Sequence, residues 1–232
     1  MADLTLIAPG GIRTALQQLL PRFETASGHK VAPSFGSGGA AKSRTAAGEF
    51  FDVPIVQPPL ESVVRSGNVV AASETPIATV AVVVAVKSGI APPDISSAEG
   101  VTRLLLAASS IAYPNAAAGA ACGVSFEATM AALGILDAMK PKTKPAPSGW
   151  RAIEMLAKGE VELGITFASE MDPDPRVQLL GALPRAISTP TGFVAFVHAR
   201  SQAPEAAEAL IRFLTTQDAQ HVFRDCGMVP GG

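Results

Sequence analysis

The sequence predicts an α/β fold in which strands and helices alternate along the chain. Short apolar runs rich in Val and Ile recur between segments whose apolar residues have helical spacing. Glycines and prolines separate these segments. With 232 residues, 48% of them hydrophobic and only 16% charged, the chain can bury the core of one large domain or two small ones. Such alternation favours mixed, mostly parallel sheets with helices on both faces.

Each segment has its own local signal. The segment 10–28 has apolar side chains at helical spacing from Ile12 to Phe23, and Gly28 is a typical helix stop. The run 77–86 is apolar and rich in Val, as in a buried central strand. In chain order we expect strands at 4–8, 30–35, 52–57, 77–86, 111–114, 161–169 and 186–199, and a short one inside 141–149. We expect helices at 10–28, 39–48, 101–109, 123–136 and 150–160, and one or two helices over 203–227.

Two long apolar strands, 77–86 and 186–199, bracket the middle of the chain. The chain is therefore expected to leave one α/β lobe, build a second and return. We predict a first lobe of residues 1–78 plus 191–232 and a second lobe of residues 79–190. Two hinge crossings join them, and a ligand cleft lies between the lobes, as in a Venus flytrap. Ligands in open α/β sheets bind beyond the carboxyl ends of the strands.

Composition excludes several classes of partner. The net charge is -2 and the chain has one Trp and one Tyr, so no nucleic-acid partner is expected. The longest apolar run has about ten residues, whereas a membrane span needs about 20, so no membrane insertion is expected. Cys122 and Cys226 are expected to be free thiols, and no His lies near a Cys in sequence. No P-loop or dinucleotide fingerprint occurs, so we expect no metal and no cofactor.

Four turns between a strand and a helix are rich in small residues, and they predict an anion site. A helix N-terminus offers unpaired N–H groups and the positive end of the helix dipole, and small residues let a ligand approach the backbone. The turns are "APGGI" (8–12), "FGSGGAA" (35–41), "YPNAAAGAACGVS" (113–125) and "PSGW" (147–150). From them we expect ligand contacts from Gly10, Gly11, Ser37, Gly38, Gly39, Ala118, Gly119, Cys122, Ser148 and Trp150.

In four stretches the chain resembles the molybdate-binding family of the type II periplasmic binding protein superfamily. They are "LTLIAPGGIRTALQQLLPRFETASGHKV", "FGSGGAAKSRTAAGEFFDVPI", "WRAIEMLAKGEVELGITFAS" and "LIRFLTTQDAQHVFRDCGMVP". The resemblance covers nearly the whole chain. It implies a two-lobed Venus-flytrap fold in which hydroxyls and backbone amides hold an oxyanion in the cleft. For an exported protein it also implies an ABC permease as partner.

Two departures from this family change the expected ligand. The family usually has a serine in its first turn, where this chain has Gly11, and often a tyrosine where it has Phe167. Ser37 keeps the serine of the second turn. A missing donor costs on the order of 1.5–3 kcal/mol of binding to a charged ligand. The resemblance therefore implies a small anion, and the departures favour an organic carboxylate over molybdate.

Further side chains are candidates beside these turns. Arg13, Arg44 and Arg151 each lie just inside a helix that follows an anion turn, where a guanidinium can clamp a carboxylate or be solvated. A thiol at a helix start such as Cys122 can have a lowered pKa, or it can be a small buried filler. Tyr113 can donate its phenol to a ligand or pack in the core.

Two functions fit these features. In the first, the protein binds a small anion without chemistry, because no nucleophile–base pair is evident in the sequence. In the second, it is a cytoplasmic enzyme on the same scaffold, an isomerase or lyase of an organic acid, with Cys122, Tyr113, Glu170 or His29 as acid/base candidates. The start "MADLTLIAPGG" has no basic region and no long apolar stretch, which favours the cytoplasm. The alternative is a periplasmic mature form whose signal peptide has been removed.

Overall fold

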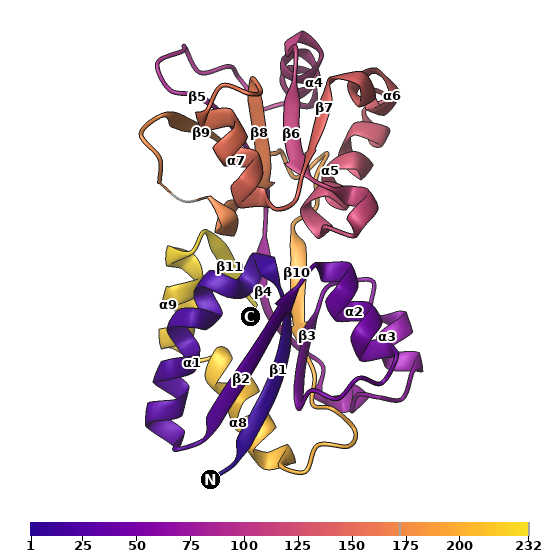
Figure 1. The fold of residues 1–232 in the computed structure, drawn as a ribbon, viewed down its shortest axis with the longest axis vertical. Coiled ribbons are helices and arrows are strands. Elements are labelled where there is room, and N and C mark those ends of the chain that lie inside the picture. Colours follow the sequence, from indigo (N-terminus) through magenta and orange to yellow (C-terminus); the bar gives the residue numbers. More distant parts are fainter. Residues whose placement is uncertain (172, 232) are drawn as a thin grey trace. The chain divides into compact units, whose positions relative to one another are not determined.

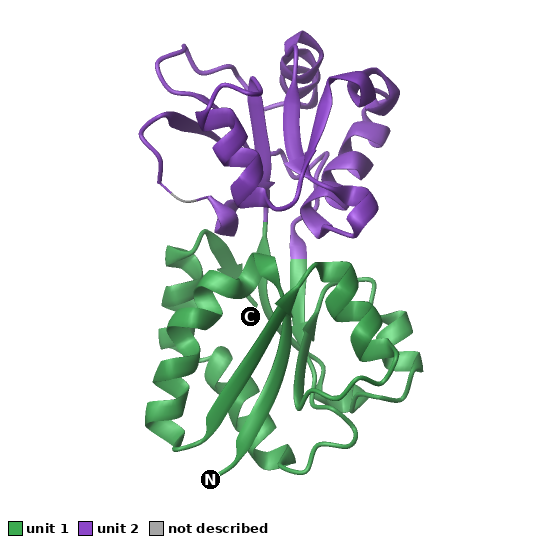
Figure 2. Cartoon of the chain, in the orientation of Figure 1, with its two compact units in different colours: residues 1–80, 192–232 green, residues 81–191 purple. Residues whose placement is uncertain are grey.

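The structure, a computed structural model, describes residues 1–171 and 173–231. The chain forms two compact units, coloured separately in Figure 2. Unit 1 consists of Met1–Val80 and Gly192–Gly232, and unit 2 of Ala81–Thr191. The chain therefore passes from one unit to the other twice, after Val80 and after Thr191. The ligand cleft expected between the lobes stays a prediction.

Unit 1 is built on a six-stranded mixed sheet with the order β11-β4-β10-β3-β1-β2 (Figure 1). Its parallel part is β1 (Asp3–Pro9) flanked by β2 (Lys30–Gly36) and β3 (Val53–Val56). Beyond β3 lies β10 (Thr191–Ala195), which runs antiparallel to it. The sheet ends with β4 (Thr75–Val80) and the antiparallel β11 (Met228–Pro230). Parallel strands thus occur where the sequence predicts the glycine-rich turns.

Helices cover both faces of this sheet (Figure 1). One face carries α2 (Gly38–Ala46) and α3 (Glu61–Arg65), which pack on each other and, through α2, on β1 and β3. The other carries α1 (Arg13–Ser27), α8 (Pro204–Leu214) and α9 (Gln217–Asp225). The apolar stripe of α1 is buried as its spacing predicts, and Gly28 ends the helix in the left-handed conformation, with φ 74°. Glycine reaches this conformation without a steric penalty.

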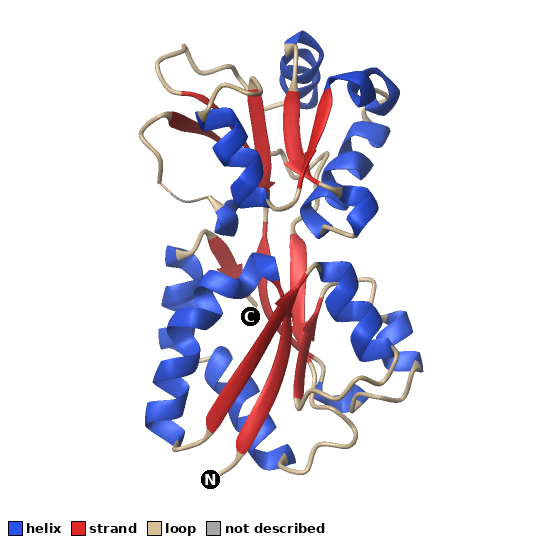
Figure 3. Cartoon of the chain, viewed as in Figure 1, coloured by secondary structure: helices blue, strands red, loops and turns tan. Residues whose placement is uncertain are grey.

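Unit 2 has a five-stranded mixed sheet with the order β7-β6-β8-β5-β9. Its parallel part is β6 (Ile111–Pro114) between β7 (Thr143–Ala146) and β8 (Leu163–Phe167). The antiparallel part is β5 (Val82–Lys87), next to β8, and β9 (Val177–Ala182). Figure 3 shows its strands and helices by type. The helices are α4 (Ala98–Ala107), α5 (Ala121–Ala132), α6 (Leu136–Met139) and α7 (Gly149–Ala157).

Several elements differ from the sequence prediction. The strand expected at 77–86 is two strands, β4 and β5, because the apolar run continues across the passage between the units at Ala81 and serves a sheet in each. The segment 203–227, where one or two helices are expected, forms two, and the hydroxyl of Thr216 caps the second by accepting from the Ala219 N–H. The expected strand 186–199 is confined to β10, and α3, β9 and β11 were not foreseen.

Candidate functional site

The parallel strands of unit 1 deliver two glycine-rich turns to the same edge of the sheet. Pro9 at the end of β1 is level with Gly36 at the end of β2. Gly10 and Ser37 are the next residues beyond that edge. Gly10–Ile12 form one turn of 3-10 helix that leads into α1, whereas Ser37 begins α2 directly. Both turns predicted from the sequence therefore lie side by side, each at the N-terminus of a helix.

Ser37 is the capping residue of α2. Its hydroxyl oxygen accepts the N–H of Ala40 at 3.1 Å. A hydroxyl can accept and donate at the same time, so the Ser37 proton can still be given to a ligand oxygen. The N–H groups of Gly38 and Gly39 belong to the first turn of the helix and have no acceptor within it. This turn offers the donors that an anion needs.

The three arginine candidates differ in their partners. Arg13 lies over the ring of Phe35, with its guanidinium carbon 4.9 Å from the ring centre, beside the turn that contains Ser37. Arg44 donates from Nε to Glu49 at 2.7 Å and from a terminal nitrogen at 2.5 Å, which leaves it little capacity for a ligand. Arg151 is paired with Glu154 on its own helix. Of the three, Arg13 is the one that the described residues leave without a carboxylate partner.

The third turn, in unit 2, uses most of its own amides. Asn115 caps it, because its side-chain oxygen accepts the Ala117 N–H at 3.0 Å. The N–H groups of Ala118, Gly119 and Ala120 donate to carbonyls within the same loop. The backbone donors expected at Ala118 and Gly119 are therefore already engaged, contrary to the simplest reading of the sequence.

The open donors of this turn lie at the start of α5. The N–H groups of Ala121, Cys122 and Gly123 have no acceptor within the helix, and Ala120 offers no capping side chain. Gly123 allows α5 to begin directly against β6: a Cβ there would lie 1.9 Å from the Pro114 oxygen. A glycine is thus required at this position for the N-terminus to stay where it is.

The thiol of Cys122 is not activated by its place in this first turn. The side chain is 2% exposed. Burial raises the pKa of the Cys122 thiol well above its ordinary value, and the negative charge of Glu170 adds to the rise. The thiol is therefore protonated at neutral pH, and the lowered pKa that a helix start can produce does not occur here.

The fourth turn, before α7, already has a carboxylate against it. Ser148 caps α7 by accepting the Arg151 N–H at 3.2 Å. A Cβ on Gly149 would lie 2.4 Å from a carboxylate oxygen of Glu170, so Glu170 reaches the first turn of the helix. The same oxygen accepts from the Thr166 hydroxyl at 3.2 Å. Phe167, 3% exposed, ends β8 nearby, whereas Trp150 is 54% exposed. Glu170 thus brings an acid/base group to the carboxyl edge of this sheet.

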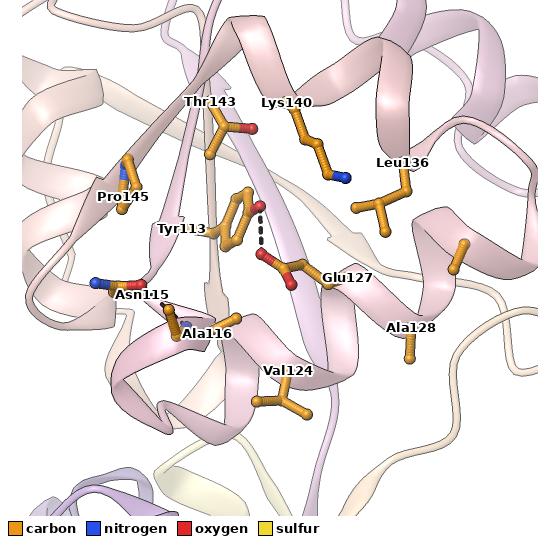
Figure 4. Close-up of a pocket in the computed structure, with 12 residues that line it drawn as sticks. Tyr113, Asn115, Ala116, Val124, Glu127, Ala128, Leu136, Lys140, Thr143 and Pro145 are labelled. Atoms are coloured by element: carbon orange, nitrogen blue, oxygen red, sulfur yellow. Dashed lines mark hydrogen bonds between the residues drawn. The ribbon is translucent and has the colours of Figure 1, made fainter.

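Two other acid/base candidates lie elsewhere. His29 accepts the Ala2 N–H at the amino end of β1, the opposite end of the strand from the glycine-rich turns. Tyr113 lines a cavity of about 640 Å³ in unit 2, where its hydroxyl donates to Glu127 at 2.9 Å (Figure 4). Burial raises the pKa of Tyr113 to about 12. His29 lies outside the four turns, and Tyr113 is the first residue of the third, but its hydroxyl is already engaged with Glu127.

The cavity in Figure 4 is a poor anion site. The carboxylate of Glu127 points into it beside the Tyr113 phenol, and Lys140 on its rim pairs with Asp137 at 2.7 Å. None of the anion-binding residues expected from the four turns lines it. A cavity with a carboxylate at its centre suits a cation or a neutral group better than an anion.

Sequence reasoning missed Gln57, which follows β3 at the same edge as Gly10 and Ser37. Its side chain is 3% exposed, and neither its nitrogen nor its oxygen has a partner among the described residues. The signal that was available is a polar residue directly after the buried run 53–56.

Among the described residues, no group of three His, Cys, Asp or Glu side chains is placed to hold a metal ion. No described helix has the length and apolarity to cross a bilayer.

Comparison with known proteins places the chain in a family. A family described as bacterial extracellular solute-binding protein matches residues 4–229, nearly the whole length. The chain belongs to this solute-binding protein family. Among its relatives is an aconitate isomerase from a Pseudomonas species, which is 31% identical over 99% of this chain and 88% of that protein.

Solved structures agree on the fold of this solute-binding protein. The periplasmic molybdate-binding protein of Azotobacter vinelandii matches with a TM-score of 0.77 and 19% identity over 99% of this chain and 100% of that one. The sulfate-binding protein of Mycobacterium tuberculosis H37Rv matches with a TM-score of 0.75 and 20% identity over 99% of this chain and 87% of that one. A tungstate-binding protein of Desulfovibrio alaskensis matches with a TM-score of 0.71 and 13% identity over 100% of both chains. These likenesses confirm the two-lobed α/β fold of periplasmic binding proteins and the predicted resemblance.

Proposed function

We propose that this solute-binding protein binds a small organic carboxylate at the carboxyl ends of its parallel strands. The observation that carries the proposal is the placement of the Gly10 and Ser37 turns at one sheet edge, each at the start of a helix. Two helix N-termini and a hydroxyl donor favour a negative charge there. Unit 2 has an open helix start of its own at α5, whose first N–H groups lack a capping side chain.

A carboxylate suits these donors better than a tetrahedral oxyanion. Gly11 and Phe167 supply no hydroxyl where the molybdate-binding family often has one. Arg13 supplies a planar fork of N–H groups beside the Ser37 turn, and such a fork matches the two oxygens of a carboxylate. The name of the aconitate isomerase relative adds support, since aconitate is a tricarboxylate. An ABC permease is the proposed partner if the protein is exported, and the cytoplasm remains the alternative location.

Titration calorimetry on the wild type tests the proposal. The panel is citrate, tricarballylate, cis- and trans-aconitate, malate, molybdate and sulfate. We expect at least one carboxylate to bind more tightly than molybdate and sulfate, and to raise the melting temperature by mass action. Binding of molybdate or sulfate alone would contradict the proposed ligand class.

Ser37→Ala is the matched test of the site. We expect it to weaken the bound carboxylate by about tenfold or more, because a hydrogen bond to a charged group contributes about 1.5–3 kcal/mol. Ser97→Ala is the control, since Ser97 caps α4 by accepting the Gly100 N–H at the same 3.1 Å. Both variants lose a cap, so both lose about 0.5–2 kcal/mol of stability. Equal affinities in the two variants would remove Ser37 from the site.

A second candidate function is the isomerisation of an unsaturated organic acid. It is favoured by the relative that is 31% identical over 99% of the chain. Moving a double bond to the neighbouring carbon pair requires a group that removes a proton from one carbon and returns it to another. Glu170 is the proposed group, because its carboxylate reaches Gly149 and Thr166 at the edge where anions are expected.

Incubation with cis- or trans-aconitate in D₂O separates the two functions. An isomerase interconverts the two acids, and proton magnetic resonance follows both the interconversion and any deuterium uptake from the solvent. Glu170→Gln should abolish turnover and retain binding. Binding of aconitate without any conversion would leave the first proposal standing and exclude this second function for aconitate.

A further inference from the structure

Gln57 has an unusual environment for a primary amide. The side chain is 3% exposed, and both Nε2 and Oε1 lack hydrogen-bond partners among the described residues. Buried side-chain amides in native proteins are nearly always satisfied, because an unmet buried donor or acceptor is costly. An amide with both ends unmet indicates that a group outside the protein chain completes it.

The strand register places Gln57 at the proposed anion site. β1 and β3 are parallel, with Leu6 paired to Val53 and Ile7 to Pro54. Continued beyond the strand ends, this register makes Gln57 level with Gly10. The register between β1 and β2 makes Gly10 level with Ser37 in turn. Three neighbouring strands thus present Ser37, Gly10 and Gln57 in one row.

The alternation of side chains along β3 indicates which helix Gln57 faces. Val56 packs in a cluster with Val63 of α3 and Phe196. Successive residues of a strand point to opposite faces, and this alternation, continued one residue beyond β3, assigns Gln57 to the other face. That face is covered by α1, which is preceded by the Gly10–Ile12 turn (Figure 1). The buried amide therefore lies on the side of the sheet where the first anion turn begins.

The chemistry of an amide restricts what can satisfy it. The Nε2 group donates and Oε1 accepts. A fully deprotonated oxyanion has only acceptor oxygens, so it can meet Nε2 but leaves Oε1 unmet. An O–H group beside an oxygen acceptor meets both ends of the amide at once.

We propose that Gln57 is a specificity residue of this site and that the ligand presents an O–H donor next to an oxygen acceptor. This inference rests on the proposed binding of an organic acid. Two sources have the required pattern. One is the hydroxyl of a hydroxycarboxylic acid, and the other is a carboxyl group that binds with its proton.

Two probes distinguish the sources. Citrate and tricarballylate have the same tricarboxylate skeleton, and citrate has one additional hydroxyl. If Gln57 binds the hydroxyl of the ligand, calorimetry on the wild type should show that citrate binds about tenfold more tightly than tricarballylate. If Gln57 binds a protonated carboxyl group, the two acids should have similar affinities. Both should then bind more tightly in mildly acidic than in neutral solution, with a larger gain in affinity than sulfate shows.

Gln57→Met is the decisive variant, because methionine has a similar length and no strong donor or acceptor. It should abolish whichever preference the wild type shows, for the hydroxyl or for the bound proton. The ligand-free variant should melt at the wild-type temperature or above it, since it buries no unmet polar group. A Gln57 that merely supports the fold would instead lower the melting temperature when replaced.

The outcomes separate this inference from the proposed function. If Ser37→Ala weakens carboxylate binding while Gln57→Met leaves every affinity unchanged, the inference is wrong and the binding function stands. A lower melting temperature of ligand-free Gln57→Met with unchanged preferences also overturns the inference. If no carboxylic acid binds to the wild type, the proposed function and the inference both fall.

Discussion

Two arginines that follow the glycine-rich turns of unit 1 have different surroundings. Arg13 and Arg44 each stack on a phenylalanine, at 4.9 Å from Phe35 and 5.0 Å from Phe51 respectively. Arg44 is held by Glu49 through two nitrogens, whereas no carboxylate in the described part of the chain pairs with Arg13. An arginine needs unused N–H groups to bind a carboxylate, so only the first is suited to clamp a ligand.

We therefore predict that Arg13→Gln and Arg44→Gln affect binding differently. Arg13→Gln should weaken a bound carboxylate by about tenfold or more, the loss expected for one charge-assisted hydrogen bond. Arg44→Gln should change the affinity by less than about twofold and have little effect on stability, since its ion pair is exposed. Calorimetry and chemical unfolding of both variants measure these effects. A larger loss of affinity in Arg44→Gln would reverse the assignment.

At the residue scale, the sequence predicted which turns bear donors but not which donors are unused. Small residues before a helix predict backbone N–H groups without an acceptor in the helix, and such groups occur in the first turn of α2 after Ser37 and in the first turn of α5. It did not hold at Gly119, whose N–H donates within its own loop. Composition also cannot reveal that Glu170 reaches Gly149 in the α7 turn, because that contact joins residues 21 positions apart through the fold.

The start of α5 in unit 2 depends on a close approach between the helix and the backbone before it. α5 begins against the end of β6, where a Cβ on Gly123 would lie 1.9 Å from the Pro114 oxygen and 2.9 Å from the Ala116 nitrogen. Backbone atoms cannot move aside as the end of a long side chain can. The position of the α5 N-terminus therefore depends on one missing methyl group.

Gly123→Ala should displace this N-terminus. We expect a loss of about 1–3 kcal/mol of stability from the overpacking, and weaker anion binding because the open N–H groups move. Gly192→Ala is the control, since the nearest neighbour of its Cβ would be Pro58 at 3.7 Å, an ordinary contact. Thermal unfolding and calorimetry compare the two. An unchanged affinity in a destabilised Gly123→Ala would separate α5 from binding.

The element scale also shows where pattern reasoning stops. Hydrophobic periodicity located most helices and strands, because each buries one face on a sheet. It could not divide the run 77–86, since the residues on both sides of Ala81 are apolar and both are buried in strands. Nor could it foresee β11, which has three residues and forms only by pairing with β4. Breaks imposed by chain topology leave little trace in local composition.

At the scale of the whole molecule, the fold was predictable and the ligand was not. Alternating elements and a family resemblance along the whole chain predicted a two-lobed α/β protein. We propose that ligand choice depends on a few polar groups, such as Gln57, which lacks a partner among the described residues, and Arg13, which lies over Phe35. Their hydrogen-bonding state becomes visible only after the strands are placed in register.

At the same scale, we predict that a buried histidine in unit 1 limits the stability of the molecule in acid. His198 is 1% exposed, its Nδ1 accepts the Arg200 N–H at 3.1 Å, and its Nε2 lacks a partner among the described residues. Burial lowers the pKa of His198 below its ordinary value of 6.5, and the charge of Arg200 lowers it further, while Asp52 opposes the shift. The folded protein therefore holds this imidazole neutral.

The sign of the pH effect follows from proton linkage. With a lowered pKa in the folded state, the unfolded chain binds more protons at His198 once the pH falls below about 6.5. Stability from this group is complete above that pH and is lost as the pH falls toward the folded-state pKa.

His198→Asn keeps an acceptor for the Arg200 N–H and removes the titration. We expect the melting temperature of the variant, followed by circular dichroism, to fall less between neutral pH and about pH 5 than that of the wild type. The slope of melting temperature against pH is the decisive quantity, because the smaller side chain can shift the melting temperature equally at both pH values. Parallel curves for the variant and the wild type would show that His198 does not limit stability in acid.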